Sequence, residues 1–193
     1  LKVISNPDMK QIKQYINPKV EVFLLTRTNK LLNYLAWDLA SEQIPFTYTD
    51  HKKEEAYGWT DTKIKIINEV TAAPPTINKQ NLLLDLMTKA KLASYDKQLH
   101  EWKKGEFTYK FMKYYIGTTI DPAKIKTKIG TIHSVKGEEA TIVILFNDIT
   151  RKIADNLEDE KTLEDERKVW YVGMTRSKLI LVIVDGYFLD RTK

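Results

Sequence analysis

Apolar and polar positions follow two different periods in the first part of the chain. Val20–Thr26 is a short run of β-branched, leucine and aromatic side chains, which is typical of a buried strand. Apolar residues then recur at helical spacing from Asn29 to Gln43, and Pro45 ends this helix. Thr60–Val70 has the same spacing and predicts a second helix. The buried positions of the two helices are expected to be Leu32, Leu35, Ala36, Leu39, Ala40, Ile64, Ile67 and Val70.

A break at Ala72–Pro75 separates this part from the rest of the chain. Asn78–Trp102 is rich in leucine and lysine and predicts a helix, after which aromatic residues cluster. Three short apolar runs follow and predict strands at Ile129–Ile132, Thr141–Phe146 and Leu179–Val184. Strands that alternate with helices predict an α/β fold, with a mostly parallel sheet flanked by helices and a small, mainly helical insertion.

The composition excludes several classes of protein and of site but does not indicate a function. The chain has 193 residues, 42% hydrophobic and 30% charged, which suits a globular protein with one well-packed core. Its net charge of +5 permits a nucleic-acid surface but is equally compatible with solvated lysines. The lack of cysteine excludes disulfides and thiolate metal sites. No segment has the length and apolarity of a membrane span or a signal peptide. We therefore expect a soluble, cytoplasmic protein without a membrane partner, and an opening residue of Leu1 suggests part of a longer chain.

The stretch Glu164–Ser177 carries the most specific signal. By itself it reads as an amphipathic helix, which Thr162 could cap, with one face that holds Val169, Trp170, Gly173 and Met174. Arg176 would then be a charge favourable to the helix C-terminus.

The whole string, with Tyr171-Val172-Gly173 and Thr175-Arg176-Ser177, resembles the last signature motif of superfamily 1 helicases of the UvrD/Rep type. In that family the arginine reaches the γ-phosphate of ATP. The resemblance implies that Arg176 is a catalytic, ATP-binding residue and that the sheet is RecA-like. Ser177 replaces the usual alanine.

The segment Thr131–Glu139 follows one predicted strand and precedes another. A loop with these donors could bind a phosphate backbone, although a lone loop of this kind is more often a solvated turn. The order T-x-H-S-x-K-G-x-E resembles the preceding helicase motif. That resemblance implies a contact with single-stranded DNA through Thr131, His133, Ser134 and Lys136, and a bond from Glu139 to the ATP ribose. Glu138 stands where the family usually has leucine.

The third motif is the turn Leu24–Asn29, at the carboxyl end of the first predicted strand, where α/β sheets bind ligands. Together with Ile44-Pro45-Phe46 it resembles the motif that opens the second lobe of these helicases. The resemblance implies that Arg27 is a second γ-phosphate arginine. Thr26 stands where the family often has an adenine-stacking tyrosine.

The resemblance implies a discontinuous RecA-like lobe, residues 1–70 and 127–193, with a reduced helical insertion at residues 71–126. The family's Gly-x-x-Phe-x-x-Arg element is absent from His51–Trp59, where only Tyr57-Gly58-Trp59 remains. Lysines and aromatics in the insertion could either bind nucleic acid or form the two faces of a packing helix. They are Lys103, Lys104, Phe107, Tyr109, Lys110, Phe111, Lys113, Tyr114 and Tyr115.

No G-x-x-x-x-G-K-[ST] phosphate loop occurs in the sequence. We therefore expect the C-terminal motor lobe of an ATP-dependent DNA helicase for replication or repair, inactive by itself. ATP with Mg²⁺ would be bound mainly by an N-terminal RecA-like lobe of the same protein, and no metal ligands are expected in this chain. The alternative is a non-catalytic module, derived from a helicase lobe, that binds nucleic acid or protein. No nuclease-like carboxylate cluster supports a nuclease.

Overall fold

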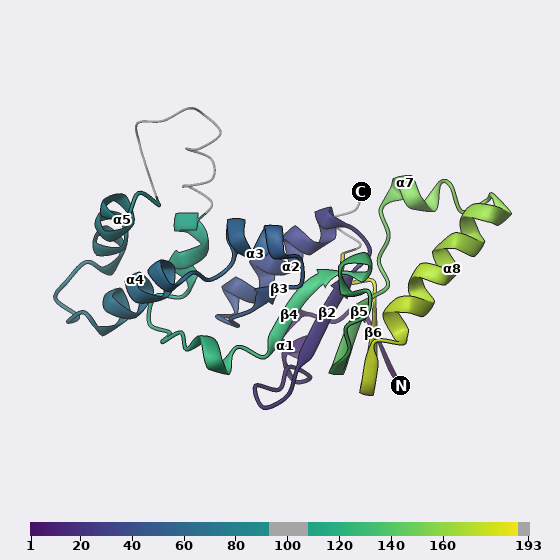
Figure 1. The fold of residues 1–193 in the computed structure, drawn as a ribbon, viewed down its shortest axis with the longest axis horizontal. Coiled ribbons are helices and arrows are strands. Elements are labelled where there is room, and N and C mark those ends of the chain that lie inside the picture. Colours follow the sequence, from purple (N-terminus) through teal and green to yellow (C-terminus); the bar gives the residue numbers. More distant parts are fainter. Residues whose placement is uncertain (93–107, 189–193) are drawn as a thin grey trace.

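The computed structural model describes residues 1–92 and 108–188, which form one parallel sheet covered on both faces by helices (Figure 1). The order of the strands is β1-β6-β5-β2-β4-β3, and every neighbouring pair is parallel. The strands are β1 (Lys2–Ser5), β2 (Val22–Thr26), β3 (Thr47–Tyr48), β4 (Thr127–Thr131), β5 (Ala140–Phe146) and β6 (Ser177–Asp185). The α/β fold predicted from the sequence is confirmed.

The centre of the sheet is formed by β2 and β5, which pair from Val22↔Ile142 to Leu25↔Leu145. All five residues of β2 are buried, because helices cover both of its faces. The four predicted apolar runs correspond to β2, β4, β5 and β6, with ends that differ from the prediction by a few residues.

The larger core lies between one face of the sheet and the helices α1 (Met9–Lys13), α2 (Asn29–Ser41), α4 (Asp61–Ala72) and α5 (Lys79–Lys89). The short helix α3 (His51–Tyr57) follows β3. Thr28 caps α2 by accepting a hydrogen bond from the backbone of Leu31, and the helix ends at Ser41. The predicted apolar face of α2 is buried. Thr60 caps α4, in which Ile67 and Val70 are buried and Ile64 is half-buried.

Helices α4 and α5 lie at one end of the molecule, beyond β3 and β4 (Figure 1). Residues 108–114 are also helical, and Phe111 and Tyr115 belong to the same core as α2. The Tyr115 hydroxyl donates to the carbonyl of Ile44 at 2.8 Å. These two aromatics therefore pack in the interior, as an amphipathic helix requires, whereas Tyr114 is 44% exposed. The short 3-10 helix η1 (Pro122–Lys124) leads back to the sheet.

One expectation for this region has a different outcome, and others are not tested. The helix predicted over Asn78–Trp102 ends at Lys89 as α5, and Lys91 takes a positive φ of 57°. Residues 93–107, with Lys103, Lys104 and Phe107, lie outside the described residues. The division into residues 1–70 with 127–193 and residues 71–126 stays a prediction.

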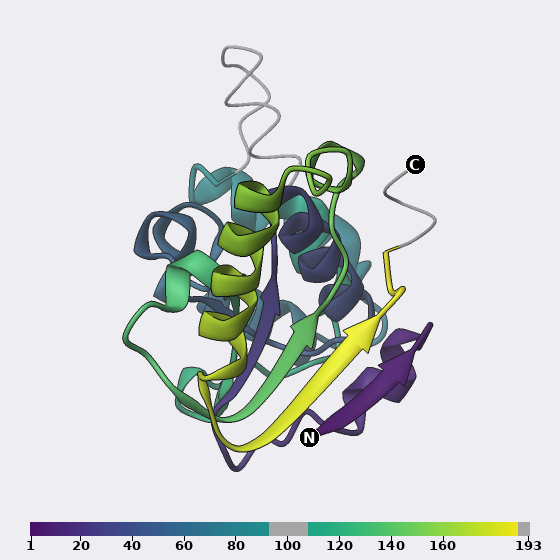
Figure 2. The same cartoon turned by 90° about the vertical axis from the view of Figure 1, so that its right-hand side faces the viewer.

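The other face of the sheet is covered by α8 (Glu160–Met174) and the 3-10 helix η2 (Ile132–Val135) (Figure 2). The short helix α7 (Arg151–Ala154) precedes α8 in the chain. Phe23, Leu25 and Val143 of the sheet pack here against η2 and α8. Gly173 is needed for close approach, because a Cβ there would lie 3.2 Å from Leu145 and 3.4 Å from Ile132. The predicted packing face of α8 is confirmed.

The cap predicted for α8 is wrong. Asp159, not Thr162, is the N-cap residue, and its carboxylate accepts hydrogen bonds from the backbone and the hydroxyl of Thr162 at 2.8 and 2.7 Å. A carboxylate can hold two donors at once, so it replaces the hydroxyl as the cap. Among the described residues, no helix is long and apolar enough to cross a bilayer.

Candidate nucleotide and nucleic-acid site

Arg27 lies directly after β2, at the carboxyl edge of the sheet. Its Nε donates to Oε2 of Glu166 at 2.8 Å, and its Nη2 donates to Oε1 of the same carboxylate. The side chains of Arg27 and Glu166 are only 18% and 13% exposed. The hydrogen bonds from Arg27 to Glu166 raise the pKa of Arg27, while partial burial opposes this rise. The pair joins the end of β2 to the sheet-facing side of α8.

Thr26, where the family often has tyrosine, is fully buried, and its hydroxyl donates to the carbonyl of Thr28 at 3.1 Å. Its side chain offers no face on which an adenine could stack.

Arg176 lies at the opposite end of α8, just before β6. Its Nε donates to the carbonyl of Val172 at 3.0 Å, and its Nη2 donates to the Thr175 hydroxyl at 3.1 Å. Nη1 lies 3.4 Å from the carbonyl of Glu138. The guanidinium thus satisfies the carbonyl of Val172 in the last turn of α8, as a favourable charge at that end would. The side chain is half-buried.

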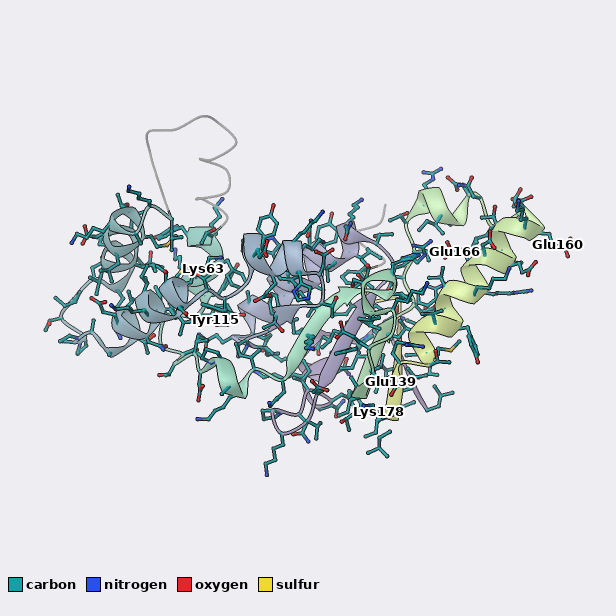
Figure 3. The ribbon with its side chains drawn as sticks, viewed as in Figure 1. Lys63, Tyr115, Glu139, Glu160, Glu166 and Lys178 are labelled. Carbon is teal, nitrogen blue, oxygen red and sulfur yellow. The ribbon has the colours of Figure 1, made fainter. Side chains whose placement is uncertain are left out.

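Glu139 lies beside Arg176 at the amino edge of the sheet. The backbone of Ala140 donates to the carbonyl of Arg176 at 3.0 Å, which places the two segments side by side. Glu139 is exposed, and its Oε2 lies 3.8 Å from Nζ of Lys178. Figure 3 shows these two residues side by side, below the C-terminal end of α8. The structure therefore brings together the two residues expected to bind phosphate and ribose.

The segment Thr131–Gly137 connects the carboxyl edge of β4 to the amino edge of β5. Ile132 and Val135 are buried beneath α8, whereas His133 and Lys136 are exposed. Thr131 and Ser134 are half-buried. Ser134 donates to the carbonyl of Thr131 at 2.8 Å, and its oxygen lies 2.6 Å from the hydroxyl of Thr49. The burial of Ile132 and Val135 thus fixes the loop so that His133 and Lys136 face solvent.

Arg27 and Arg176 are not brought together. Ala140 of β5 lies beside Arg176, whereas Arg27 follows the far end of β2. At about 3.3 Å per residue along a strand, roughly 20 Å separate their backbones. One γ-phosphate cannot contact both arginines in this conformation. Arg27 instead shares an edge with the DNA-loop candidate, because Thr26 pairs with Thr131.

Sequence reasoning missed Glu166 and Thr49. Glu166 precedes Val169, Trp170 and Gly173 by three, four and seven positions, so helical spacing alone puts its carboxylate on the packed face. A carboxylate there needs a cationic partner. Asp148 is a structural residue, since its carboxylate accepts hydrogen bonds from the backbones of Tyr187 and Phe188. Within residues 1–92 and 108–188, no group of three acidic or histidine side chains could hold a metal ion.

Comparisons with known proteins agree with the motif resemblance. Residues 117–185 match the family model of the UvrD-like helicase C-terminal domain. The chain is 23% identical to a probable DNA helicase II homolog of Mycoplasma genitalium, over 93% of this chain and 26% of that relative. It therefore spans about a quarter of the length of that relative. With the parallel α/β sheet and the motifs in order, these matches support a UvrD-like helicase C-terminal domain.

Proposed function

We propose that this chain is the C-terminal motor lobe of an ATP-dependent DNA helicase or translocase. An N-terminal lobe would hold ATP and Mg²⁺, and Arg176 and Glu139 would complete the nucleotide site. Neutralisation of phosphate charge by Mg²⁺ would come from that lobe. The residues of this chain fit one side of a nucleotide, because a guanidinium binds phosphate oxygens and a carboxylate accepts from ribose hydroxyls.

The packing of η2 against α8 carries this proposal. The same helix that ends next to Arg176 covers Ile132 and Val135, which anchor His133 and Lys136. Gly173 lies against Ile132 only three residues before Arg176. A shift of α8 on ATP binding or release would therefore move the DNA loop. The exposed Lys136 would bind a phosphate, and His133 would contact the strand.

The role of Arg27 is less direct. The resemblance predicts a γ-phosphate contact, but that contact needs an arrangement in which Arg27 and Arg176 approach each other. In the present arrangement, the turn at Arg27 lies next to Thr131, on the side of the proposed DNA loop.

The test is Arg176→Ala in the full-length protein. If Arg176 stabilises charge on the transferred phosphoryl group, kcat for ATP hydrolysis should fall by about 100-fold or more. The affinity for single-stranded oligo(dT) should change little. Arg176→Lys should recover only part of the activity, because an ammonium lacks the paired donors of the guanidinium. Near-normal turnover in Arg176→Ala would contradict the assignment. A full-length protein without DNA-stimulated ATPase would favour the non-catalytic binding module.

A further inference from the structure

The ion pair between Arg27 and Glu166 joins two segments that are 139 residues apart in the sequence. Arg27 belongs to the turn after β2, and Glu166 lies near the middle of α8. Figure 3 shows Glu166 on the inner side of α8, well away from Glu139 and Lys178 at the opposite end of the sheet. The pair is therefore a contact on the side of the proposed DNA loop, and it is made by the helix that leads to Arg176.

The geometry of the pair fixes the direction of the guanidinium. A guanidinium has five N–H donors, and a carboxylate that binds two of them leaves the other side of the fork available. In the described part of the chain, Arg27 makes no hydrogen bond other than those to Glu166. Glu166 thus holds the remaining donors in a set orientation, and the turn that carries Arg27 borders Thr131, with which Thr26 pairs.

The position of Glu166 along α8 could let the pair transmit movement from one end of the helix. Ten residues separate Glu166 from Arg176, which is about 15 Å at the rise of an α-helix. A helix of this length moves as a stiff unit, so a displacement at its C-terminal end also displaces Glu166. The carboxylate would then move Arg27, whose turn borders the proposed DNA loop.

We propose that Glu166 is a positioning residue that couples the nucleotide site to the nucleic-acid edge by holding Arg27. This inference rests on the proposed function and adds a second link to the packing of Ile132 against Gly173. The simpler possibility is a clamp that only stabilises α8 on the sheet. The two differ in what is lost when the clamp is removed: stability alone, or the response of ATP hydrolysis to DNA.

The test compares Glu166→Gln, Arg27→Ala and the double variant in the full-length protein. The readouts are kcat and KM for ATP, with and without saturating oligo(dT), and the melting temperature. For Glu166→Gln we expect the stimulation of kcat by oligo(dT) to fall about fivefold or more, the usual lower range of coupling between sites. Basal kcat and KM should stay within about twofold of wild type, since Glu166 does not touch the nucleotide edge.

The double variant shows whether Glu166 acts through Arg27. If it does, adding Glu166→Gln to Arg27→Ala should cause no further loss of stimulation. Glu164→Gln is the matched control, because Glu164 lies on the same helix, is 65% exposed and pairs with Lys168 rather than with Arg27. This control should keep normal stimulation.

The outcomes separate the proposals. A lower melting temperature with unchanged stimulation would reduce the pair to a structural clamp, and an additive double variant would place Glu166 outside the action of Arg27. Either result overturns the inference and leaves the motor-lobe function intact. If Arg176→Ala kept its turnover, or the wild type showed no stimulation by DNA, the proposed function itself would fail.

Discussion

The hydroxyl oxygens of Thr49 and Ser134 lie 2.6 Å apart, although 85 residues separate the two in the sequence. Thr49 follows β3, and Ser134 lies in η2, whose exposed neighbours are the candidate DNA contacts. Gly130 makes the contact possible, because a Cβ at this position would lie 2.0 Å from the Thr49 hydroxyl and 2.6 Å from that of Ser134. The loop is thus fixed by the Thr49–Ser134 hydroxyl pair and by the burial of Ile132 and Val135 against α8.

Replacing Thr49 by valine should loosen this loop. Valine keeps the shape of threonine but leaves the Ser134 hydroxyl without this partner, at a cost of about 1 kcal/mol in unfolding free energy. Hydrogen exchange of the amides of residues 131–137 should accelerate, and affinity for oligo(dT) should fall. Thr49→Ser, which restores the hydroxyl, should return both measurements towards wild type. Wild-type exchange and affinity in Thr49→Val would show that the hydroxyl pair does not organise the loop.

The Arg27–Glu166 and Thr49–Ser134 contacts differ in how far the sequence could predict them. Glu166 was predictable, because helical spacing places it on the face of α8 that packs against the sheet. Thr49 was not, because no local period relates it to Ser134, and only the pairing of β3 with β4 brings them together. The edge strands β1 and β3 escaped prediction as well. Their four and two residues are too short to show a period, and their partners β6 and β4 determine where they lie.

For Arg27 and Arg176, the sequence predicted the residues but not their separation in the structure. Each motif was recognisable in its own strand and helix context, and Arg27 was expected at the carboxyl end of its strand, but the resemblance assigned both arginines to one γ-phosphate. The strand order and register place Arg176 with Glu139 and place Arg27 with Thr131. Local patterns therefore predicted the candidate residues, whereas the grouping into two edges depended on the tertiary structure.

The exposed Lys136 should contribute one phosphate contact to DNA binding. In Lys136→Ala, the plot of log affinity for oligo(dT) against log salt concentration should lose about 0.7 from its slope, the value for one phosphate on a single strand. The loss should be similar for different sequences, because a phosphate contact reads no base.

Lys124→Ala is the matched charge control for Lys136. Lys124 has an 82% exposed side chain paired with Asp121, and it lies in η1, away from the loop. Its replacement should leave the slope as in wild type. Equal slopes in Lys136→Ala and wild type would remove Lys136 from the interface. His133→Ala should also weaken binding.

Asp148 holds the chain after β6 against the end of β5. Its two carboxylate oxygens accept hydrogen bonds from the backbones of Tyr187 and Phe188, each at 3.2 Å. Burial raises the pKa of Asp148 above the ordinary 3.8, the two backbone donors oppose the rise, and the nearby charge of Asp185 adds to it. The residue is 6% exposed, so this carboxyl group lies in the interior.

This raised pKa predicts a pH-dependent difference in stability between wild type and Asp148→Asn. The folded state binds the proton more tightly than the unfolded state, so the stabilisation by protonated Asp148 is complete below pH 3.8 and disappears as pH rises through the folded pKa. Asparagine does not titrate, although it loses one of the two acceptors. Urea unfolding between about pH 4 and 7 should therefore show the wild type losing free energy relative to Asp148→Asn as pH rises, with a plateau above the folded pKa. Asp159→Asn should differ in the opposite sense and at lower pH, because hydrogen bonds from Thr162 lower the pKa of Asp159 below 3.8. The stabilisation by ionised Asp159 is complete above pH 3.8 and is lost as pH falls through the folded pKa. A wild-type advantage over Asp148→Asn that grows with pH would mean that the backbone donors outweigh burial at this carboxylate.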